Sequence, residues 1–273
     1  MQSHQRIAVV GATGRLGRHV VDVLEERGHD VVAISRSLGV DVVTGEGLAE
    51  ALAGVETVID AASQPTPEQE AATAFFTTAT HNLEEVGERA GVQRIVVVSI
   101  IGIDRFTAGF LAAKRVHEEA MLAGPIPVRI LRAAQFHEFV PELVDWGRRD
   151  GVSYVPNMRT QLVAARTVAE ALADLATAPD LAETGTAPIP EIAGPREERL
   201  VEMARLVAGR RGDPVRVEGV TNPAVRSCRG RMPPLPAPPS KSGSRASGQT
   251  ELLSPNALYV RRGGENPLQR RTP

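Results

Sequence analysis

From residue 6 onward, short runs of aliphatic and β-branched residues alternate with longer segments in which apolar residues recur every three or four positions. The short runs are typical of buried strands and the longer segments of amphipathic helices. Their alternation predicts βαβ units, and therefore a parallel sheet with helices on both faces. The predicted strands are residues 6–10, 31–35, 57–61, 94–99 and 128–132.

The helical pattern is clearest directly after the first strand. Apolar residues recur at helical spacing between Leu16 and Leu24, and Gly28 stands where a left-handed residue would end this helix. Further helices are predicted over residues 47–53, 67–90 and 108–123. Together these elements predict an α/β fold, with a Rossmann-type doubly wound parallel sheet and a small C-terminal substrate lobe.

The second half of the chain has a looser pattern. Residues 135–150 are predicted to form a loop or short helix over the carboxyl ends of the strands, the edge at which open sheets bind ligands. The small lobe is predicted to contain two strand–helix pairs and a last strand. The strands are residues 161–164, 189–193 and 215–217, and the helices are residues 167–176 and 197–208. The predicted organisation is a sheet domain at 1–134, a lid and small lobe packed on it at 135–223, and a tail at 224–273.

The tail differs from the rest of the chain in charge and composition. The tail contains nine Lys or Arg residues and only two acidic residues, Glu251 and Glu265, so its charge is +7. Because the whole chain has a net charge of −2, residues 1–223 carry −9. The tail's many Pro, Ser and Gly residues and its lack of apolar periodicity predict disorder. Two interpretations stay open: an aberrant end of the chain, or a basic segment that docks on an acidic partner or on nucleic acid.

Composition excludes several classes of protein. Aromatic residues make up only 3% of the chain, which argues against a base-stacking nucleic-acid binder. Cys228 is the only cysteine, so there is no internal disulfide framework and no cysteine-based zinc cluster. No apolar run approaches the roughly 18 residues of a membrane helix, and the polar N-terminus lacks a signal-peptide core. We expect a cytoplasmic protein that acts on a small molecule.

The most informative motif is the turn GATGRLG at residues 11–17, which follows the first predicted strand and opens a helix. In this context the glycines allow a tight turn whose backbone amides, with the helix N-terminus, can face a pyrophosphate. A turn that merely needs small residues is the alternative. The motif predicts a dinucleotide site made by Gly11, Thr13, Gly14, Arg15, Leu16 and Gly17.

The end of the second predicted strand indicates which dinucleotide binds. An acidic residue about 20 residues after the glycine turn would bind a free ribose 2′-hydroxyl, but this place holds Ser35, Arg36 and Ser37. A guanidinium beside hydroxyl groups attracts a 2′-phosphate, which favours NADP(H) over NAD(H). Arg15 could supply a second positive charge. Alternatively, both arginines are solvated surface charges.

Three motifs, at residues 7–17 (IAVVGATGRLG), 96–102 (VVVSIIG) and 130–136 (ILRAAQF), resemble those of the atypical short-chain dehydrogenase/reductases, in particular the NmrA-like group of NAD(P)-binding proteins. The resemblance covers roughly residues 5–220 and implies a doubly wound sheet with a small C-terminal lobe. The residues that it places along the cofactor are those of the glycine turn, Arg36, Ala61, Ala62 and Ser99, with Asp41 and Val42 beside the adenine.

The catalytic motif of the family is incomplete in this chain. Typical members use a Tyr-x-x-x-Lys pair in which the lysine lowers the pKa of the phenol and the phenol passes a proton. Here the spacing holds Phe110 and Lys114, and phenylalanine has no proton to give. The resemblance leaves Lys114 and Ser99 as candidate catalytic residues, with Lys114 also on the cofactor. Alternatively, Lys114 is a solvated helix charge and Ser99 satisfies backbone groups at a strand end.

Two functions follow from this incomplete motif. The first is an NADPH-dependent reductase of a quinone-like or otherwise activated small molecule, which takes its proton from water or from Lys114. The second is a non-catalytic NAD(P) redox sensor that regulates a partner protein, and we favour the first.

Other polar clusters are weaker candidates for a functional site. His137 and Glu138 are expected to be lid residues, His117 lies on a helix face, and the six histidines show no zinc-binding spacing.

Overall fold

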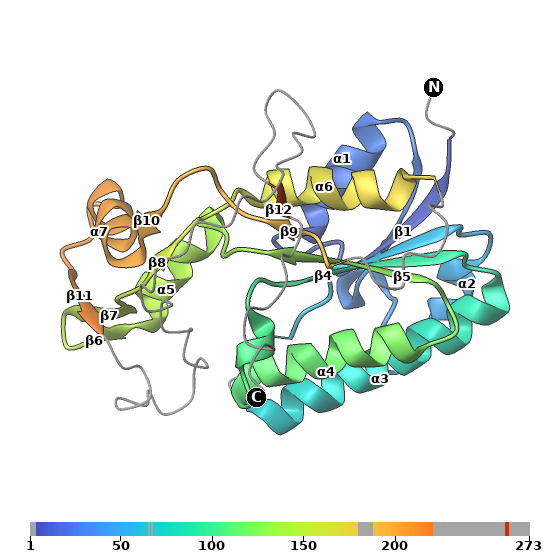
Figure 1. The fold of residues 1–273 in the computed structure, drawn as a ribbon, viewed down its shortest axis with the longest axis horizontal. Helices are drawn as coiled ribbons and strands as arrows, with labels where there is room; N and C mark the ends of the chain where they lie inside the picture. Colours follow the sequence, from blue (N-terminus) through green and yellow to red (C-terminus); the bar gives the residue numbers. More distant parts are fainter. Residues whose placement is uncertain (1–3, 65, 67, 180–187, 221–259, 262–273) are drawn as a thin grey trace, which may run out of the picture.

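The computed structural model describes residues 4–64, 66, 68–179, 188–220 and 260–261. Its main sheet contains β1 Arg6–Val10, β2 Asp30–Ile34, β3 Thr57–Asp60, β4 Arg94–Ile100, β5 Val128–Ala133, β9 Glu191–Ile192 and β12 Val260–Arg261. The strand order is β12-β9-β5-β4-β3-β1-β2, and every pair is parallel except β12 with β9 (Figure 1). The predicted Rossmann-type doubly wound parallel sheet is therefore confirmed.

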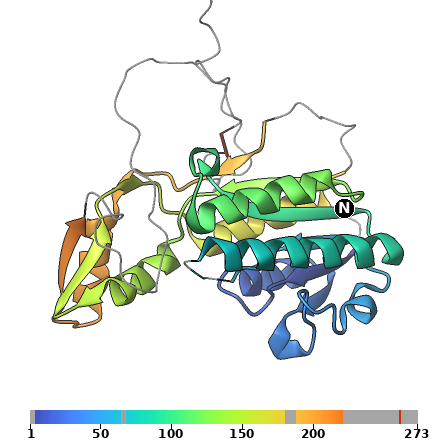
Figure 2. The same cartoon turned by 90° about the horizontal axis from the view of Figure 1, so that it is seen from below.

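Helices cover both faces of this sheet. One face carries α1 Gly17–Glu26 and α6 Ala165–Thr177, and the other carries α2 Leu48–Leu52, α3 Gln69–Ala90 and α4 Gly109–Ala123. Figure 2 shows α3 and α4 side by side in front of the strands. Along β1, Ile7 and Val9 pack toward α1 and α6, whereas Ala8 and Val10 pack toward the opposite layer. Because both faces of the central strands are buried, β1, β3 and β4 are almost unbroken apolar runs.

A small lobe stands beside the main sheet (Figure 1). Its elements are η3 His137–Phe139, α5 Val140–Trp146, β6 Arg148–Arg149, β7 Val152–Pro156, β8 Arg159–Thr160, β10 Glu198–Arg199, α7 Leu200–Arg210 and β11 Arg216–Val220. Strands β11, β7 and β6 form one small sheet, and β10 pairs with β8. Residues such as Leu143, Val155 and Leu200 give the lobe a hydrophobic core of its own.

The lobe is smaller than the sequence indicates. The predicted helix at 167–176 is α6, which packs on α1 and the main sheet through residues such as Val168 and Leu172. The predicted strand at 189–193 is β9, which pairs with β5 in the main sheet. The predicted strand at 161–164 is replaced by β8 just before it and by a single bridge from Val163 to Phe136. Apolar periodicity shows that one face is buried, but not which sheet buries it.

The first five predicted strands begin and end within one residue of β1 to β5, whereas the predicted strand at 189–193 is shortened to β9. Gly28 follows α1 with φ +80°, as predicted for a left-handed residue. The predicted tail at 224–273 lies outside the described residues except for β12, which pairs with β9. Among the helices that the structure describes, none has the length and apolar character to cross a membrane. The cytoplasmic location stays a prediction.

Polar contacts hold α6 in place at both ends. The α6 N-terminus is capped by Glu138, whose two carboxylate oxygens each lie 3.1 Å from the amide nitrogen of Ala165. At the other end, the buried Arg94 donates to the carbonyl oxygen of Ala176 at 2.8 Å. Because a helix is partly positive at its N-terminus and partly negative at its C-terminus, both charges are stabilising. Glu138 is thus engaged as a helix cap.

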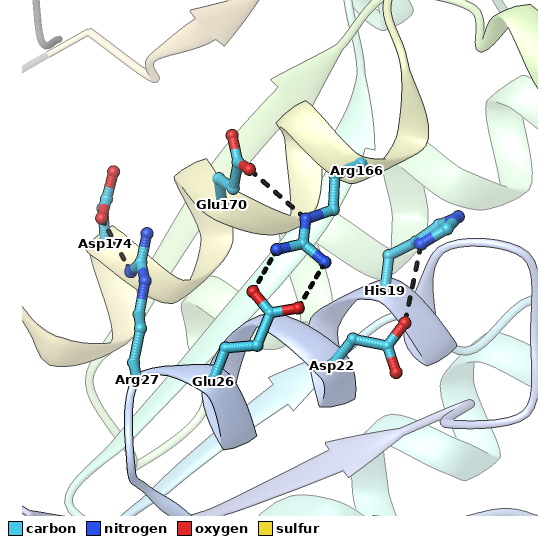
Figure 3. A network of polar contacts seen from close by, with 7 residues as sticks. All are labelled: His19, Asp22, Glu26, Arg27, Arg166, Glu170 and Asp174. Carbon is cyan, nitrogen blue, oxygen red and sulfur yellow. Dashed lines mark hydrogen bonds and ion pairs between the residues drawn. The ribbon is translucent and has the colours of Figure 1, made fainter.

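The exposed side of the α1–α6 pair carries a further set of ion pairs (Figure 3). Arg166 of α6 contacts both carboxylate oxygens of Glu26 in α1, and also Glu170 one turn along its own helix at 3.3 Å. Arg27 pairs with Asp174 at 2.8 Å. Isolated exposed pairs of this kind contribute little because water and salt screen them. They fix the register of two helices that the buried apolar contacts already hold together.

Candidate cofactor and active site

The glycine turn lies where the order of the sheet reverses. β1 is flanked by β2 on one side and β3 on the other, so the chain leaves β1 and β3 in opposite directions across the sheet. Open α/β sheets bind ligands at this switch point, outside the carboxyl ends of the strands. Residues that follow β1, β2, β3 and β4 therefore lie at the same edge of the sheet, around this switch point.

Steric limits explain why the turn needs glycine. Gly11 has φ +76°, and a Cβ there would lie 2.8 Å from the carbonyl oxygen of Ala61, which follows β3. A Cβ at Gly17 would lie 2.1 Å from the carbonyl oxygen of Gly11. These two glycines let the turn fold back onto the start of α1 and approach the chain after β3. The turn therefore brings Ala61 and Ala62 to the same place, as the resemblance implies.

The turn also leaves donors for an anion. Within the described chain, the backbone amides of Thr13, Arg15 and Leu16 reach no backbone acceptor, whereas Gly11 donates to the carbonyl oxygen of Ile34 at 2.9 Å. The first turn of α1 contains no acidic residue, and no side chain caps it. Unpaired amides at the positive end of a helix suit a pyrophosphate, so this turn fits the dinucleotide that the sequence predicts.

Three hydroxyl groups gather beside the turn at the end of β2. Ser35 Oγ lies 2.9 Å from Ser37 Oγ, which in turn lies 3.4 Å from Thr13 Oγ1. Arg36 is exposed between the two serines, and its side chain makes no ion pair or hydrogen bond among the described residues. Hydroxyl donors next to an available guanidinium are the donor set that a ribose 2′-phosphate requires.

Arg15 has a different environment from Arg36. Its guanidinium forms an ion pair with Glu142 of α5 and lies 5.4 Å from the ring centre of Phe139. A cation over an aromatic ring and a carboxylate together stabilise this orientation. Arg15 therefore connects the glycine turn to the lid segment. A role on the 2′-phosphate stays a prediction, and would require Arg15 to leave Glu142.

Asn82 has a clear structural role. Its side-chain amide donates to the carbonyl oxygens of Val42 at 2.9 Å and Val43 at 2.8 Å. Asp41, in the same loop, accepts from the amide of Val43 at 2.7 Å. These bonds shape the loop that the family resemblance places beside the adenine. Contact of Asp41 and Val42 with the adenine stays a prediction.

Ser99 lies near the carboxyl end of β4 with only 3% of its surface exposed. Ile95 and Val97 of the same strand pack toward α2, α3 and α4, and side chains two residues apart point to the same face. Ser99 therefore faces α4. Its Oγ is buried without a hydrogen-bond partner. Buried hydroxyl groups are normally paired, so the unpaired one is consistent with a place for a ligand atom.

Lys114 is buried, not solvated, with only 5% of its surface exposed. Its Nζ lies 2.9 Å from Nδ1 of His117, one turn along α4. The other ring nitrogen of His117, Nε2, lies 3.1 Å from Oδ2 of Asp60 at the end of β3. The second oxygen of Asp60 accepts from the amide of Ala62 at 2.9 Å. We call Asp60, His117 and Lys114 the buried triad.

Aromatic rings enclose the buried triad on the side of α3. Lys114 Nζ lies 4.6 Å from the ring centre of Phe76, and the His117 ring stacks on Phe76 at 4.8 Å. Phe110, which occupies the place of the family tyrosine, lies 5.7 Å from Phe76 between ring centres. The side of the site toward α3 is therefore apolar. The electron-rich face of the Phe76 ring favours the lysine cation.

The environment shifts the pKa of each member of the triad. Burial lowers the pKa of Lys114 to about 8, against the opposing charges of Asp60 and Glu118. Burial and the charge of Lys114 lower the pKa of His117. Burial would raise the pKa of Asp60, but the hydrogen bond and charge of His117 and the charge of Lys114 bring it below its usual value. At neutral pH the triad thus contains a carboxylate, a neutral imidazole and an ammonium group.

A second charged network fixes the helix that carries the triad. Arg132 of β5 forms a two-point contact with Glu118 at 2.6 and 3.1 Å, and another with Asp104 at 2.6 and 2.9 Å. Glu118 is buried next to His117 in sequence. Because Arg132 neutralises Glu118, that carboxylate is not free to pair with Lys114. The network holds α4 against β5 at the edge where Ser99 lies.

Asp60 and His117 are the residues that the sequence interpretation missed. Asp60 ends an apolar strand at the ligand-binding edge, and His117 lies three residues after Lys114, on the same side of a helix. Both signals were present, but only the fold brings the strand end and the helix together. His137 is 44% exposed in the lid and lies 4.0 Å from Glu198. It takes no part in the buried triad.

The fold and the glycine turn define a dinucleotide-binding α/β protein. A model of an NAD(P)H-binding family matches residues 11–179, which is more than half of the chain, and the chain belongs to this family. It is an oxidoreductase-like NAD(P)H-binding protein. The predicted resemblance to a family of NAD(P)-binding proteins is confirmed.

Two curated proteins match part of the chain. A 3-beta-hydroxysteroid dehydrogenase of Mycolicibacterium neoaurum is 32% identical over 112 residues, 33% of this chain and 31% of that protein. The photosystem II assembly factor Ycf39 of Synechocystis sp. is 32% identical over 110 residues, 35% of this chain and 34% of that protein. The chain therefore matches about a third of the length of these curated relatives.

Solved structures share the fold at low sequence identity. MoeE5 in complex with UDP-glucose and NAD has a TM-score of 0.61 and 20% identity, over 78% of this chain and 85% of that one. The triphenylmethane reductase of Citrobacter sp., complexed with NADP(H), has a TM-score of 0.54 and 19% identity, over 79% of each chain. These structures support an NAD(P)-binding Rossmann fold and do not distinguish NADP from NAD.

Proposed function

We propose that this protein is an NADPH-dependent reductase of a quinone-like or otherwise activated small molecule. The observation that carries the proposal is the buried lysine. Lys114 lies on the same side of the sheet as Ser99, and its Nζ is held 2.9 Å from His117. A buried ammonium group can stabilise negative charge that develops on a substrate oxygen, because little water screens it.

In this proposal the bound NADPH supplies a hydride, and the residues of the chain bind, orient and protonate. The glycine turn holds the pyrophosphate, and Arg36 with its neighbouring hydroxyls holds the 2′-phosphate. Lys114 donates a proton to the oxygen that becomes negative when a quinone or conjugated carbonyl compound accepts the hydride. Hydride and proton together complete a two-electron reduction, so no phenol is needed at Phe110.

The choice of an activated acceptor follows from the absent phenol. An isolated ketone needs a strong proton donor in the transition state, whereas hydride addition to a quinone or enone gives a delocalised anion that needs less help. On the sequence motifs we further propose that the protein belongs to the NmrA-like group, and on its single cysteine that it acts in the reducing environment of the cytoplasm. We also propose that the NAD(P)-binding domain ends at residue 134 and that the lid and small lobe begin at residue 135. From this second part, α6 and β9 pack back on the main sheet.

The alternative is a redox sensor that binds NAD(P) without turnover. Phe110 favours it, because the usual proton donor is missing. The test measures NADPH binding by fluorescence, then NADPH oxidation with a panel of quinones, enones, simple ketones and aldehydes. We expect oxidation with quinones or enones and little with simple ketones. Tight NADPH binding without turnover of any acceptor would overturn the reductase proposal and favour the sensor.

Cofactor preference provides a separate prediction. Arg36→Asp removes a positive charge from the 2′-phosphate and adds a repulsive one. Hydrogen bonds to charged groups contribute about 1.5–3 kcal/mol, so the preference for NADPH over NADH should fall by about 10–100-fold. The measurement is the ratio of the two Kd values. Arg210→Asp, the same change at an exposed site in the small lobe, is the control and should leave the ratio unchanged. An unaltered ratio in Arg36→Asp would refute the assignment.

A further inference from the structure

We infer that Asp60 and His117 are positioning residues for Lys114: Asp60 fixes the imidazole tautomer whose Nδ1 accepts a hydrogen bond, and this tautomer holds Lys114 as an oriented ammonium group. The inference deepens the proposed reductase function, and rests on it for its catalytic meaning. Its structural content, the tautomer and the protonation of the lysine, can be tested without any substrate.

The contacts around Asp60 determine the tautomer. The amide of Ala62 can only donate, and it occupies Oδ1 of Asp60 at 2.9 Å. Oδ2 then faces Nε2 of His117 at 3.1 Å. A carboxylate can only accept, so in a neutral imidazole the proton must sit on Nε2. Nδ1 is left with a lone pair, and it can accept a hydrogen bond from Lys114 Nζ at 2.9 Å.

The charged groups that act on the triad lie on β3, α4 and β5. Asp60 belongs to β3, and Lys114 and Glu118 belong to α4. Glu118 is paired with Arg132 of β5, and α3 contributes the apolar ring of Phe76. Asp60 is therefore the counter-charge that keeps Lys114 protonated in a buried place. Lys114 uses one N–H on His117 and has two left for a ligand, since the described residues offer it no other hydrogen-bond partner.

Asp60→Asn should reverse this arrangement. The amide of Ala62 can only donate, so it retains the side-chain oxygen of the asparagine. The NH2 group of the asparagine then faces Nε2 of His117, which must accept and therefore lose its proton. Nδ1 gains the proton and turns a donor toward Lys114, which favours a neutral amine. The loss of the negative charge acts in the same direction.

The sequence permits a direct measurement, because Lys114 and Lys241 are the only lysines of the chain. The full-length protein, free of cofactor, is labelled with 13Cε-lysine and titrated by NMR. Lys241→Arg assigns the two signals. We expect the Lys114 signal to titrate near pH 8, and to move down by about one to three pH units in Asp60→Asn. Asp174→Asn, an exposed carboxylate on α6, is the matched control and should cause no change.

A second measurement uses the unmodified protein. In 15N-histidine-labelled protein, His117→Asn identifies the His117 signals, and we expect the proton on Nε2. A proton on Nδ1, or an unmoved Lys114 titration in folded Asp60→Asn, would overturn the inference. If Asp60→Asn does not fold, His117→Gln and His117→Leu replace it. Glutamine can donate to Asp60 and accept from Lys114, so it should preserve the titration that leucine shifts.

The outcome separates this inference from the proposed function. A lysine that titrates as expected in a protein without turnover supports the positioning role and overturns the reductase. Turnover by the wild type, together with a Lys114 pKa that does not change in Asp60→Asn, supports the reductase and overturns the positioning role. If both hold, the alkaline limit of the reaction should move to lower pH in Asp60→Asn by the amount that the lysine titration moves. A merely structural Asp60 would lower stability without this matched displacement.

Discussion

Lys114→Met should lower kcat for NADPH oxidation by about 10²–10⁴-fold, the range associated with loss of a positioned proton donor. Methionine fills a similar volume beside Phe76 but carries no proton and no charge. The expected Kd for NADPH rises by about tenfold at most, because the variant loses a single hydrogen-bonding group and keeps the glycine turn. Stopped-flow kinetics with a quinone and direct binding measurements give the two quantities separately.

The pH dependence of the wild-type rate has a definite sign. Lys114 must be protonated to donate, and burial lowers the pKa of Lys114 to about 8. The rate should therefore be constant at lower pH and fall as the pH rises through about 8. In Lys114→Arg the side chain stays charged up to a pH above about 12, so the alkaline fall should disappear together with most of the activity.

Arg115→Met is the control for the lysine variants. Arg115 follows Lys114 in α4 but pairs with Glu119 at 3.8 Å, away from the triad. Its loss should leave kcat unchanged within about twofold, because the ion pair with Glu119 is partly exposed to solvent and contributes little. If Lys114→Met retained the wild-type rate, the proton would come from water, and the buried lysine would serve stability only.

The glycine turn can be predicted from the sequence, whereas the environment of Lys114 cannot. The turn is a local motif, and the family resemblance alone already places Ala61 and Ala62 beside it. The burial of Lys114 depends on Phe76 of α3 and Asp60 of β3, which lie far from it in sequence. An amphipathic helix with one lysine gives no sign that the lysine faces inward.

The lid and the small lobe show the same limit. The sequence gives α6 and β9 as a helix and a strand, but their place in the main sheet depends on long-range packing against α1 and β5. Likewise, the sequence marks Arg15 and Arg36 as similar cations beside the turn. Only the fold brings Glu142 onto Arg15 and leaves Arg36 available. The local sequence pattern predicts the helices and strands and the residue types at the strand ends. Which charged side chains pair with one another can be seen only in the tertiary structure.

Gly11→Ala should raise the Kd for NADPH by about 10–100-fold, because a displaced turn loses a hydrogen bond to a charged phosphate, which contributes about 1.5–3 kcal/mol. An alanine Cβ would lie 2.8 Å from the carbonyl oxygen of Ala61, so the turn or the chain after β3 must shift. Left-handed backbone costs a non-glycine residue about 1–3 kcal/mol, and the clash adds to this. The free energy of unfolding should therefore fall by more than the strain alone.

Gly28→Ala separates backbone strain from the clash at the turn. Gly28 has φ +80°, close to the +76° of Gly11, but no atom lies within 4 Å of a Cβ built there. This variant should lose about 1–3 kcal/mol of stability from strain alone and bind NADPH as the wild type does. If folded Gly11→Ala also bound NADPH normally, the glycines would serve only to turn the chain. A difference confined to Gly11→Ala would instead mean that the close approach of β1 and β3 builds the cofactor site.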